Sequence, residues 1–206
     1  AERGEKRQQV FGQRLIQATI VAANNHTYFD SDDISALNTL EQLVAGLTAE
    51  DSDDVAAELH TRLGFGFYFA RRYAESDEQL ARAEELSDRI DRPSGQRAVW
   101  IVIERARALH RLNRHEEQLR LLDRAIERAD RDEPTIYSAC LHWGRMHALE
   151  ALNRPTTEVL ACAAELVARC DAHPERLSER VRAREEASGV ALRHGRFDTS
   201  EAWARE

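Results

Sequence analysis

The chain has 206 residues, of which 42% are hydrophobic and 32% charged, and it carries a net charge of −8. It is therefore too apolar for a disordered chain and long enough to bury a continuous core. Two classes are disfavoured: a membrane protein, because no run of about 18 apolar residues occurs, and a nucleic-acid-binding protein, because the charge has the wrong sign for phosphate contacts.

Cysteine usage and the N-terminus bear on the cellular compartment. Cys140, Cys162 and Cys170 are the three cysteines, and none occurs in the first two-thirds of the chain. Residues 1–6 lack the apolar core of a signal peptide. We expect a reduced, cytoplasmic protein.

Acidic residues are concentrated early in the chain, since residues 15–61 contain nine acids and no Lys or Arg. One interpretation is an acidic face for a basic partner. The other is a series of helix starts, where carboxylates accept hydrogen bonds from free amides and complement the helix dipole. We favour the second, because six aspartates stand where helices are expected to begin: Asp30, Asp32, Asp33, Asp51, Asp53 and Asp54.

Apolar residues recur at three- and four-residue intervals in nearly every segment, which predicts an all-helical chain. The expected helices cover residues 4–24, 31–47, 52–71, 74–90, 95–112, 115–130, 134–152, 155–171, 175–194 and 198 onward. Their starts are marked by Ser, Asp or Pro at Asp30-Ser31, Ser52, Pro93-Ser94, Pro134 and Pro174. Connections of two to four residues make neighbouring helices antiparallel.

A four-residue turn recurs between these helices, at 71–74, 113–116, 153–156 and 195–198. The third members, Tyr73, His115, Pro155 and Phe197, lie 42, 40 and 42 residues apart. A fixed period in this range indicates stacked supersecondary units. Apolar residues also recur at equivalent places around the turns, six residues before the third member at Phe67, Leu109, Leu149 and Ala191.

Leu63-Gly64, Phe67, Tyr73, Leu80 and Ala83 resemble, in order and spacing, the signature of tetratricopeptide (TPR) repeats. The period is longer than the family's ~34 residues, which indicates helices about one turn longer. With this longer period the chain is similar to the long-helix TPR variants of kinesin light chains and bacterial regulators. Another helical-hairpin solenoid is the alternative fold.

The resemblance implies an all-α, right-handed superhelical stack of antiparallel hairpins, about ten helices in five pairs. We expect a single TPR-like domain over residues 1–206. It comprises a diverged first hairpin at 1–48 and repeats at 52–91, 94–131, 134–172 and 175–206, the last of them truncated.

Candidate chemistry is sparse. Cys140, His142, His147, Cys170 and His173 could supply metal ligands, but their spacing matches no standard zinc pattern. Adjacent acids such as Glu185-Glu186 point about 100° apart on a helix and do not act on one substrate as an acid–base pair. We expect no catalytic residues, no metal and no cofactor, and therefore a binding protein rather than an enzyme.

In TPR folds the first helices of successive hairpins line a concave groove, and the turn alignment carries that face onto this sequence. The candidate groove residues are Tyr68, Phe69, Trp100, Ile103, Arg107, His110, Arg111, Trp143, His147, Glu150 and Arg182. On the helix expected at 175–194, the alignment places Glu185 and Arg193 on the same face as Arg182. Trp, Tyr and Arg dominate interface energies, so this face suits a protein, a peptide or a small acidic ligand. Whether Trp100 and Trp143 line the groove or the core stays open here.

The leading hypothesis is a non-catalytic interaction or sensory module of a larger bacterial signalling protein. The resemblance suggests a region preceding a GGDEF diguanylate cyclase or part of a transcriptional regulator. The alternative is a free-standing, self-associating adaptor, with a homodimer as its consequence. A metal- or thiol-dependent site is the remote alternative.

Overall fold

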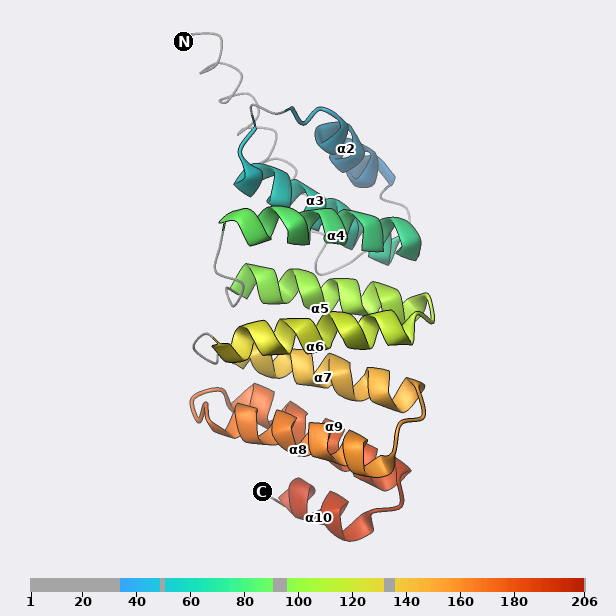
Figure 1. Ribbon diagram of the computed structural model, residues 1–206, viewed down its shortest axis with the longest axis vertical. Helices are drawn as coiled ribbons and strands as arrows, with labels where there is room; N and C mark the ends of the chain where they lie inside the picture. Colours follow the sequence, from blue (N-terminus) through green and yellow to red (C-terminus); the bar gives the residue numbers. More distant parts are fainter. Residues whose placement is uncertain (1–33, 49–50, 91–95, 132–135, 206) are drawn as a thin grey trace. The chain divides into compact units, whose positions relative to one another are not determined.

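The computed structural model describes residues 34–48, 51–90, 96–131 and 136–205. All regular structure in these ranges is helical (Figure 1). The helices are α2 (Ile34–Ala45), α3 (Asp53–Phe69), α4 (Tyr73–Ile90), α5 (Gln96–Arg111), α6 (His115–Arg131), α7 (Ile136–Ala151), α8 (Thr156–Asp171), α9 (Leu177–Arg193) and α10 (Phe197–Arg205).

These bounds lie within three residues of the predicted ones, so the nine predicted helices that fall in the described ranges are confirmed. The predicted helix at 4–24 and the starts at Pro93 and Pro134 lie outside the described residues.

The chain divides into two compact units, which we call unit 1, ending at Ile90, and unit 2, beginning at Asp91. The prediction of one domain over residues 1–206 stays a prediction. Within the described ranges no helix is both long and apolar enough to cross a bilayer.

Unit 1 is built around the antiparallel hairpin of α3 and α4, with α2 packed on α3. Ser52 caps α3, because its hydroxyl accepts a hydrogen bond from the Val55 amide at 3.4 Å, as its position in the sequence predicts. The apolar core joins α2 to α3 through Leu40, Leu43, Leu59, Leu63 and Phe67.

The two helices of this hairpin cross closely at Gly64. A methyl group added there would lie 2.6 Å from Leu80 Cγ, so only glycine allows this approach. The Ser76 hydroxyl donates to the Gly64 carbonyl at 2.8 Å across the same crossing. The glycine of the Leu63-Gly64 signature is therefore a packing requirement.

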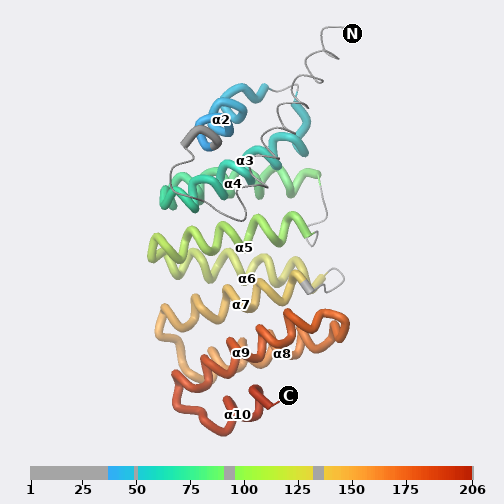
Figure 2. Tube along the Cα trace, turned by 180° about the vertical axis from the view of Figure 1, so that it is seen from behind, coloured from blue at the N-terminus to red at the C-terminus, as the bar shows by residue number. Residues whose placement is uncertain are grey.

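Unit 2 contains three hairpins, α5–α6, α7–α8 and α9–α10, and Figure 2 follows them from behind. Each helix packs against the next, and α5 also packs against α7. One apolar cluster joins α5, α6 and α7, and a second joins α6, α7, α8 and α9. Each hairpin therefore shares its core with the following one, and the predicted all-α stack of hairpins is confirmed.

The recurring turns all have the same backbone conformation. Their first residues, Arg71, Asn113, Asn153 and Gly195, have positive φ angles of 62°, 56°, 53° and 69°. In each turn the next amide donates to the carbonyl five residues back, for example Arg114 to Leu109 and Arg154 to Leu149, both at 3.0 Å. This is the Schellman motif, which ends a helix and satisfies its last carbonyls.

Candidate functional site

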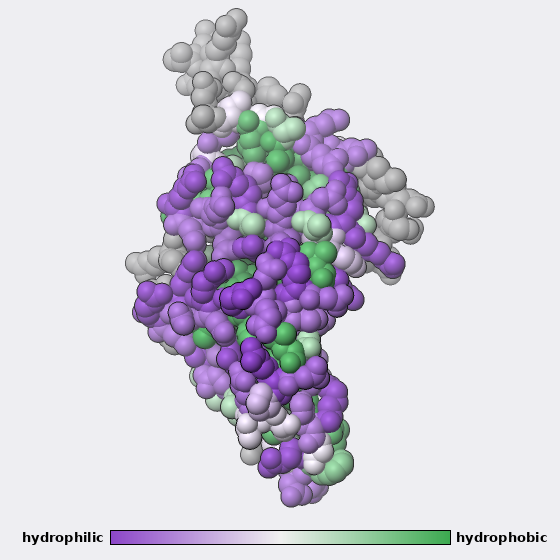
Figure 3. All heavy atoms as spheres, turned by 45° about the vertical axis from the view of Figure 1, so that its right-hand side comes forward, coloured by the Kyte–Doolittle hydropathy of each residue, from purple (hydrophilic) through white to green (hydrophobic). Residues whose placement is uncertain are grey.

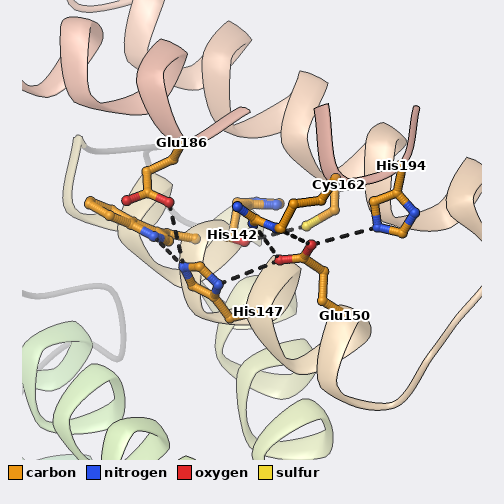
Figure 4. Close-up of polar contacts among 8 residues, drawn as sticks. His142, His147, Glu150, Cys162, Glu186 and His194 are labelled. Atoms are coloured by element: carbon orange, nitrogen blue, oxygen red, sulfur yellow. Dashed lines mark hydrogen bonds and ion pairs between the residues drawn. The ribbon is translucent and has the colours of Figure 1, made fainter. Parts of the chain in front are cut away.

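The first helices of the unit 2 hairpins bring eight of the predicted groove residues onto α5 and α7, and a ninth onto α9. The best-connected part is a network between α7 and α9, and Figure 4 shows its members His147, Glu150, Glu186 and His194. We call it the α7–α9 network; its members are Trp143, His147 and Glu150 on α7, Arg182, Glu186 and Arg193 on α9, and His194 just after α9.

Trp143 and His147 stand one turn apart on α7 and are hydrogen-bonded. The indole Nε1–H donates to His147 Nε2 at 2.7 Å. A neutral His147 therefore carries its proton on Nδ1, which lies 3.8 Å from Glu150 Oε2. His147 Nε2 is also 3.9 Å from Glu186 Oε2 on α9. The imidazole thus lies between two carboxylates.

Glu150 connects the two helices at the other end of the network. Arg193 donates to it from Nη2 at 2.8 Å and from Nε at 3.0 Å, and His194 Nε2 lies 3.6 Å from Oε1. Partial burial favours the neutral carboxyl, but the Arg193 hydrogen bonds together with the positive potential of Arg193, His147 and His194 outweigh it and lower the pKa of Glu150. Glu150 is therefore held as an anion.

Arg182 lies over the Trp143 ring, with its Cζ 4.2 Å from the ring centroid. Trp143 is half-buried and also packs against the apolar cluster of α6 to α9. It therefore belongs to both core and surface, with its polar edge turned to His147 and its ring beneath an exposed guanidinium.

On α5 the predicted residues divide between surface and core. Trp100 is 46% exposed, which places it on the surface. Ile103 packs against the cluster of α5 to α7. Arg107 is exposed and donates to the buried Glu104 at 2.9 Å, while Arg111 is exposed. Three of these four side chains therefore face solvent.

His110 lies at the end of α5 beside His115 of α6, with ring centroids 5.0 Å apart. Burial, reinforced by the positive potential of His115, lowers the pKa of His110. Its Nδ1 is buried, and no residue that the structure describes hydrogen-bonds to it. His110 is therefore a neutral, half-buried neighbour of the network rather than a cationic contact.

Tyr68 and Phe69 lie in unit 1, at the end of α3. Tyr68 contacts Phe69 and Tyr73 edge-on, at centroid distances of 5.7 and 5.4 Å, and Phe69 is 43% exposed. They form an aromatic group of their own, and their membership of the same groove stays a prediction.

The cysteines have no features of a reactive site. Burial raises the pKa of each thiol, to about 11 for Cys170, so the protonated form dominates at neutral pH. The Cys162 thiol donates to the His142 carbonyl at 3.4 Å. Among the described residues no three His, Cys, Asp or Glu side chains are grouped so as to hold a metal ion.

Sequence reasoning missed two members of the network, Glu186 and His194. The repeat alignment pointed to Glu185, but it is the next residue, Glu186, that faces His147. His194 was overlooked because it immediately precedes a turn; it contacts Glu150 and also Thr156, whose Oγ1 lies 3.0 Å from its Nδ1. The spacing of His194 from Glu150 gives no signal in the sequence.

Comparisons with solved structures agree with this architecture. BtubC (BKLC) from P. vanneervenii is similar over 99% of this chain and 82% of its own, at 14% identity and a TM-score of 0.77. The kinesin-light-chain TPR-like repeats of Podosopora anserina are similar over 93% of this chain and 92% of theirs, at 16% identity and a TM-score of 0.72.

A third similar structure is a Rap protein complexed with competence and sporulation factor, at 17% identity and a TM-score of 0.70. The match covers 92% of this chain and 51% of the Rap protein, so this chain spans about half its length. No protein-family model and no curated protein sequence matches the chain. Likeness at such low identity shows the fold, and the chain has the TPR-like fold.

Proposed function

We propose that this chain is a non-catalytic module that binds a protein or peptide partner on the α7–α9 network and the adjoining face of α5. The observation that carries the proposal is the Trp143 side chain, which is stacked under Arg182 and hydrogen-bonded to His147. Trp and Arg are the residue types that contribute most to binding energy at protein interfaces.

The network is preorganised for binding. Its side chains project from packed helices and fix one another through hydrogen bonds and ion pairs, including the paired contacts of Arg193 with Glu150. Little side-chain entropy is therefore lost when a partner docks.

The charges favour a peptide over a small acidic ligand. Arg182 offers a cation, but Glu186 stands one turn further along α9 and Glu150 lies on the facing helix. Alternating charges of this kind complement a chain of mixed polarity and repel a compact anion. The small acidic ligand is therefore the weaker candidate.

The wider context is also a proposal. The long 40–42-residue period and the resemblance to bacterial regulators support a regulatory part of a larger signalling protein, such as one with a GGDEF cyclase or a transcriptional regulator. The cytoplasmic location is proposed from cysteine usage. Sequencing the gene past the Glu206 codon tests the context: an encoded output domain supports it, and an immediate stop codon contradicts it.

A random-peptide display library tests the binding face. Peptides selected on the wild-type chain are titrated against Trp143→Ala, Arg182→Ala and a matched control, Ala161→Glu, at an exposed position of α8. We expect affinity to fall at least roughly tenfold for the first two variants, as for interface anchors, and to be unchanged for the control. Equal affinity for all four proteins would refute the assignment of the face.

A further inference from the structure

His147 accepts a hydrogen bond at a ring nitrogen that can accept only while it is unprotonated. The Trp143 indole Nε1–H donates to His147 Nε2 at 2.7 Å. A neutral imidazole has one nitrogen with a free lone pair, whereas both nitrogens of an imidazolium carry protons. Protonation of His147 therefore sets two N–H donors against each other, and its contact with Trp143 must break.

Two carboxylates lie where they can accept from a protonated His147. Glu186 Oε2 on α9 lies 3.9 Å from Nε2, the nitrogen that Trp143 occupies, and Glu150 Oε2 lies 3.8 Å from Nδ1. Figure 4 shows the imidazole between these two acids. Both distances exceed hydrogen-bond length, so Trp143 is the direct partner of Nε2 in the neutral state and Glu186 is not.

Further titratable and charged groups surround His147 on the neighbouring helices. They include His110 on α5, His115 of α6 beside it, Arg182 and Arg193 on α9, and His194 after α9. Glu158 of α8 pairs with Arg145, which lies about 200° around α7 from His147. Because Arg193 already holds Glu150, Glu186 is the carboxylate that gains most from a proton on His147.

We propose that protonation of His147 switches the α7–α9 network between two states and thereby regulates partner binding, a regulation that rests on the proposed function. In the neutral state His147 and Arg182 together fix Trp143. In the protonated state His147 pairs with Glu186 and Glu150, and Trp143 loses the acceptor that orients its indole. An anchor that is not fixed loses more side-chain entropy on binding, so the partner binds less tightly at acidic pH.

Solvent reaches the switch directly, because the His147 side chain is 38% exposed. Figure 3 shows one side of the surface as mostly hydrophilic, with separate hydrophobic groups among polar side chains. On such a surface polar contacts carry much of the specificity of binding. Histidine side chains ordinarily change charge between about pH 5 and pH 8, so measurements at these two values compare the two forms.

The indole signal of Trp143 in the free chain tests the exchange without any partner. Heteronuclear NMR follows the Nε1–H from about pH 8 to pH 5, and Trp143→Phe assigns it by its loss. We expect an upfield shift of the indole proton as pH falls, because its hydrogen bond is lost. In His147→Gln the signal should stay constant, because the amide oxygen accepts at every pH.

His110→Gln is the matched control, since it removes a neighbouring histidine and keeps His147; it should show the wild-type shift. Circular dichroism confirms that each chain is folded at both pH values. A wild-type indole signal that does not move, or one that moves equally in His147→Gln, overturns the exchange.

Peptide affinity at the two pH values tests the regulation. The peptides are selected at about pH 8 from a library without Asp, Glu or His and have capped ends, so that they do not titrate themselves. From about pH 8 to pH 5 we expect affinity to fall at least roughly threefold for the wild type and for His110→Gln, as for one lost hydrogen bond, and to change little for His147→Gln.

Equal wild-type affinity at both pH values overturns the regulation and leaves the binding face standing. If no peptide binds, the regulation falls together with the proposed function, whereas the indole signal still decides the exchange between Trp143 and Glu186.

Discussion

Arg71 is expected to destabilise the turn between α3 and α4. It holds the left-handed conformation, with φ of 62°, where the three equivalent turns have Asn or Gly. That conformation costs an ordinary L residue about 1–2 kcal/mol. Glycine removes this cost but adds about 0.5–1 kcal/mol of unfolded-chain entropy. Arg71→Gly therefore raises the unfolding free energy by about 0.5–1 kcal/mol.

The assay is urea unfolding followed by circular dichroism for the wild type, Arg71→Gly and Arg71→Ala. Alanine removes the same side chain but keeps the Cβ that makes the conformation unfavourable. We expect a higher unfolding midpoint for the glycine variant alone. No gain for glycine, or an equal gain for alanine, would refute the argument that backbone strain at this turn limits stability.

Three further predictions concern packing and pH. Gly64→Ala forces a methyl group to within 2.6 Å of Leu80 Cγ, so it should lower the unfolding free energy by about 1–3 kcal/mol in the same urea assay. Gly189→Ala is the control: its added methyl group lies 3.4 Å from the end of the Arg193 side chain, and we expect it to be neutral or stabilising. The pKa of Glu150 is lowered in the folded state, so the ionised Glu150 stabilises the fold fully above the unfolded-state pKa, and this stabilisation is lost as pH falls through the folded-state pKa. Glu150→Gln should therefore lower the unfolding midpoint at pH 7 and have less effect at pH 3. Burial lowers the pKa of His142 from 6.5 to about 4, so the folded state loses stability as pH falls between these values. The unfolding midpoint of His142→Leu should therefore depend less on pH over that range than the wild-type midpoint does. An unchanged pH dependence would count against His142 as its source.

The hairpins could be predicted from the sequence because the ends of their helices are set by local interactions. Asn113, Asn153 and Gly195 adopt the left-handed conformation readily. The amide of the residue after each one donates to the carbonyl of a core residue five positions earlier in the chain. Helix bounds and turn positions follow from such short-range constraints, whereas Gly64 is required by the contact between α3 and α4 and was marked by the repeat signature. These parts of the fold were therefore predictable.

The network between α7 and α9 was predicted only in part. Trp143, His147, Glu150 and Arg182 followed from the repeat alignment, but which acid meets His147 depends on how α9 is rotated against α7. A shift of one residue, about 100° on a helix, separates the expected Glu185 from the observed Glu186. The repeat period predicts which side of each helix faces the groove, whereas the pairing of side chains across two helices depends on their relative rotation.

In the proposed function the first helices of the unit 2 hairpins bind the partner and the second helices do not. Amide chemical-shift mapping with a library-selected peptide distinguishes the two sets of helices. We expect shifted signals along α7 and α9, including those of Trp143 and Arg182, and unchanged signals in α6 and α8. Shifts confined to α6 and α8, with Trp143 unaffected, would contradict it.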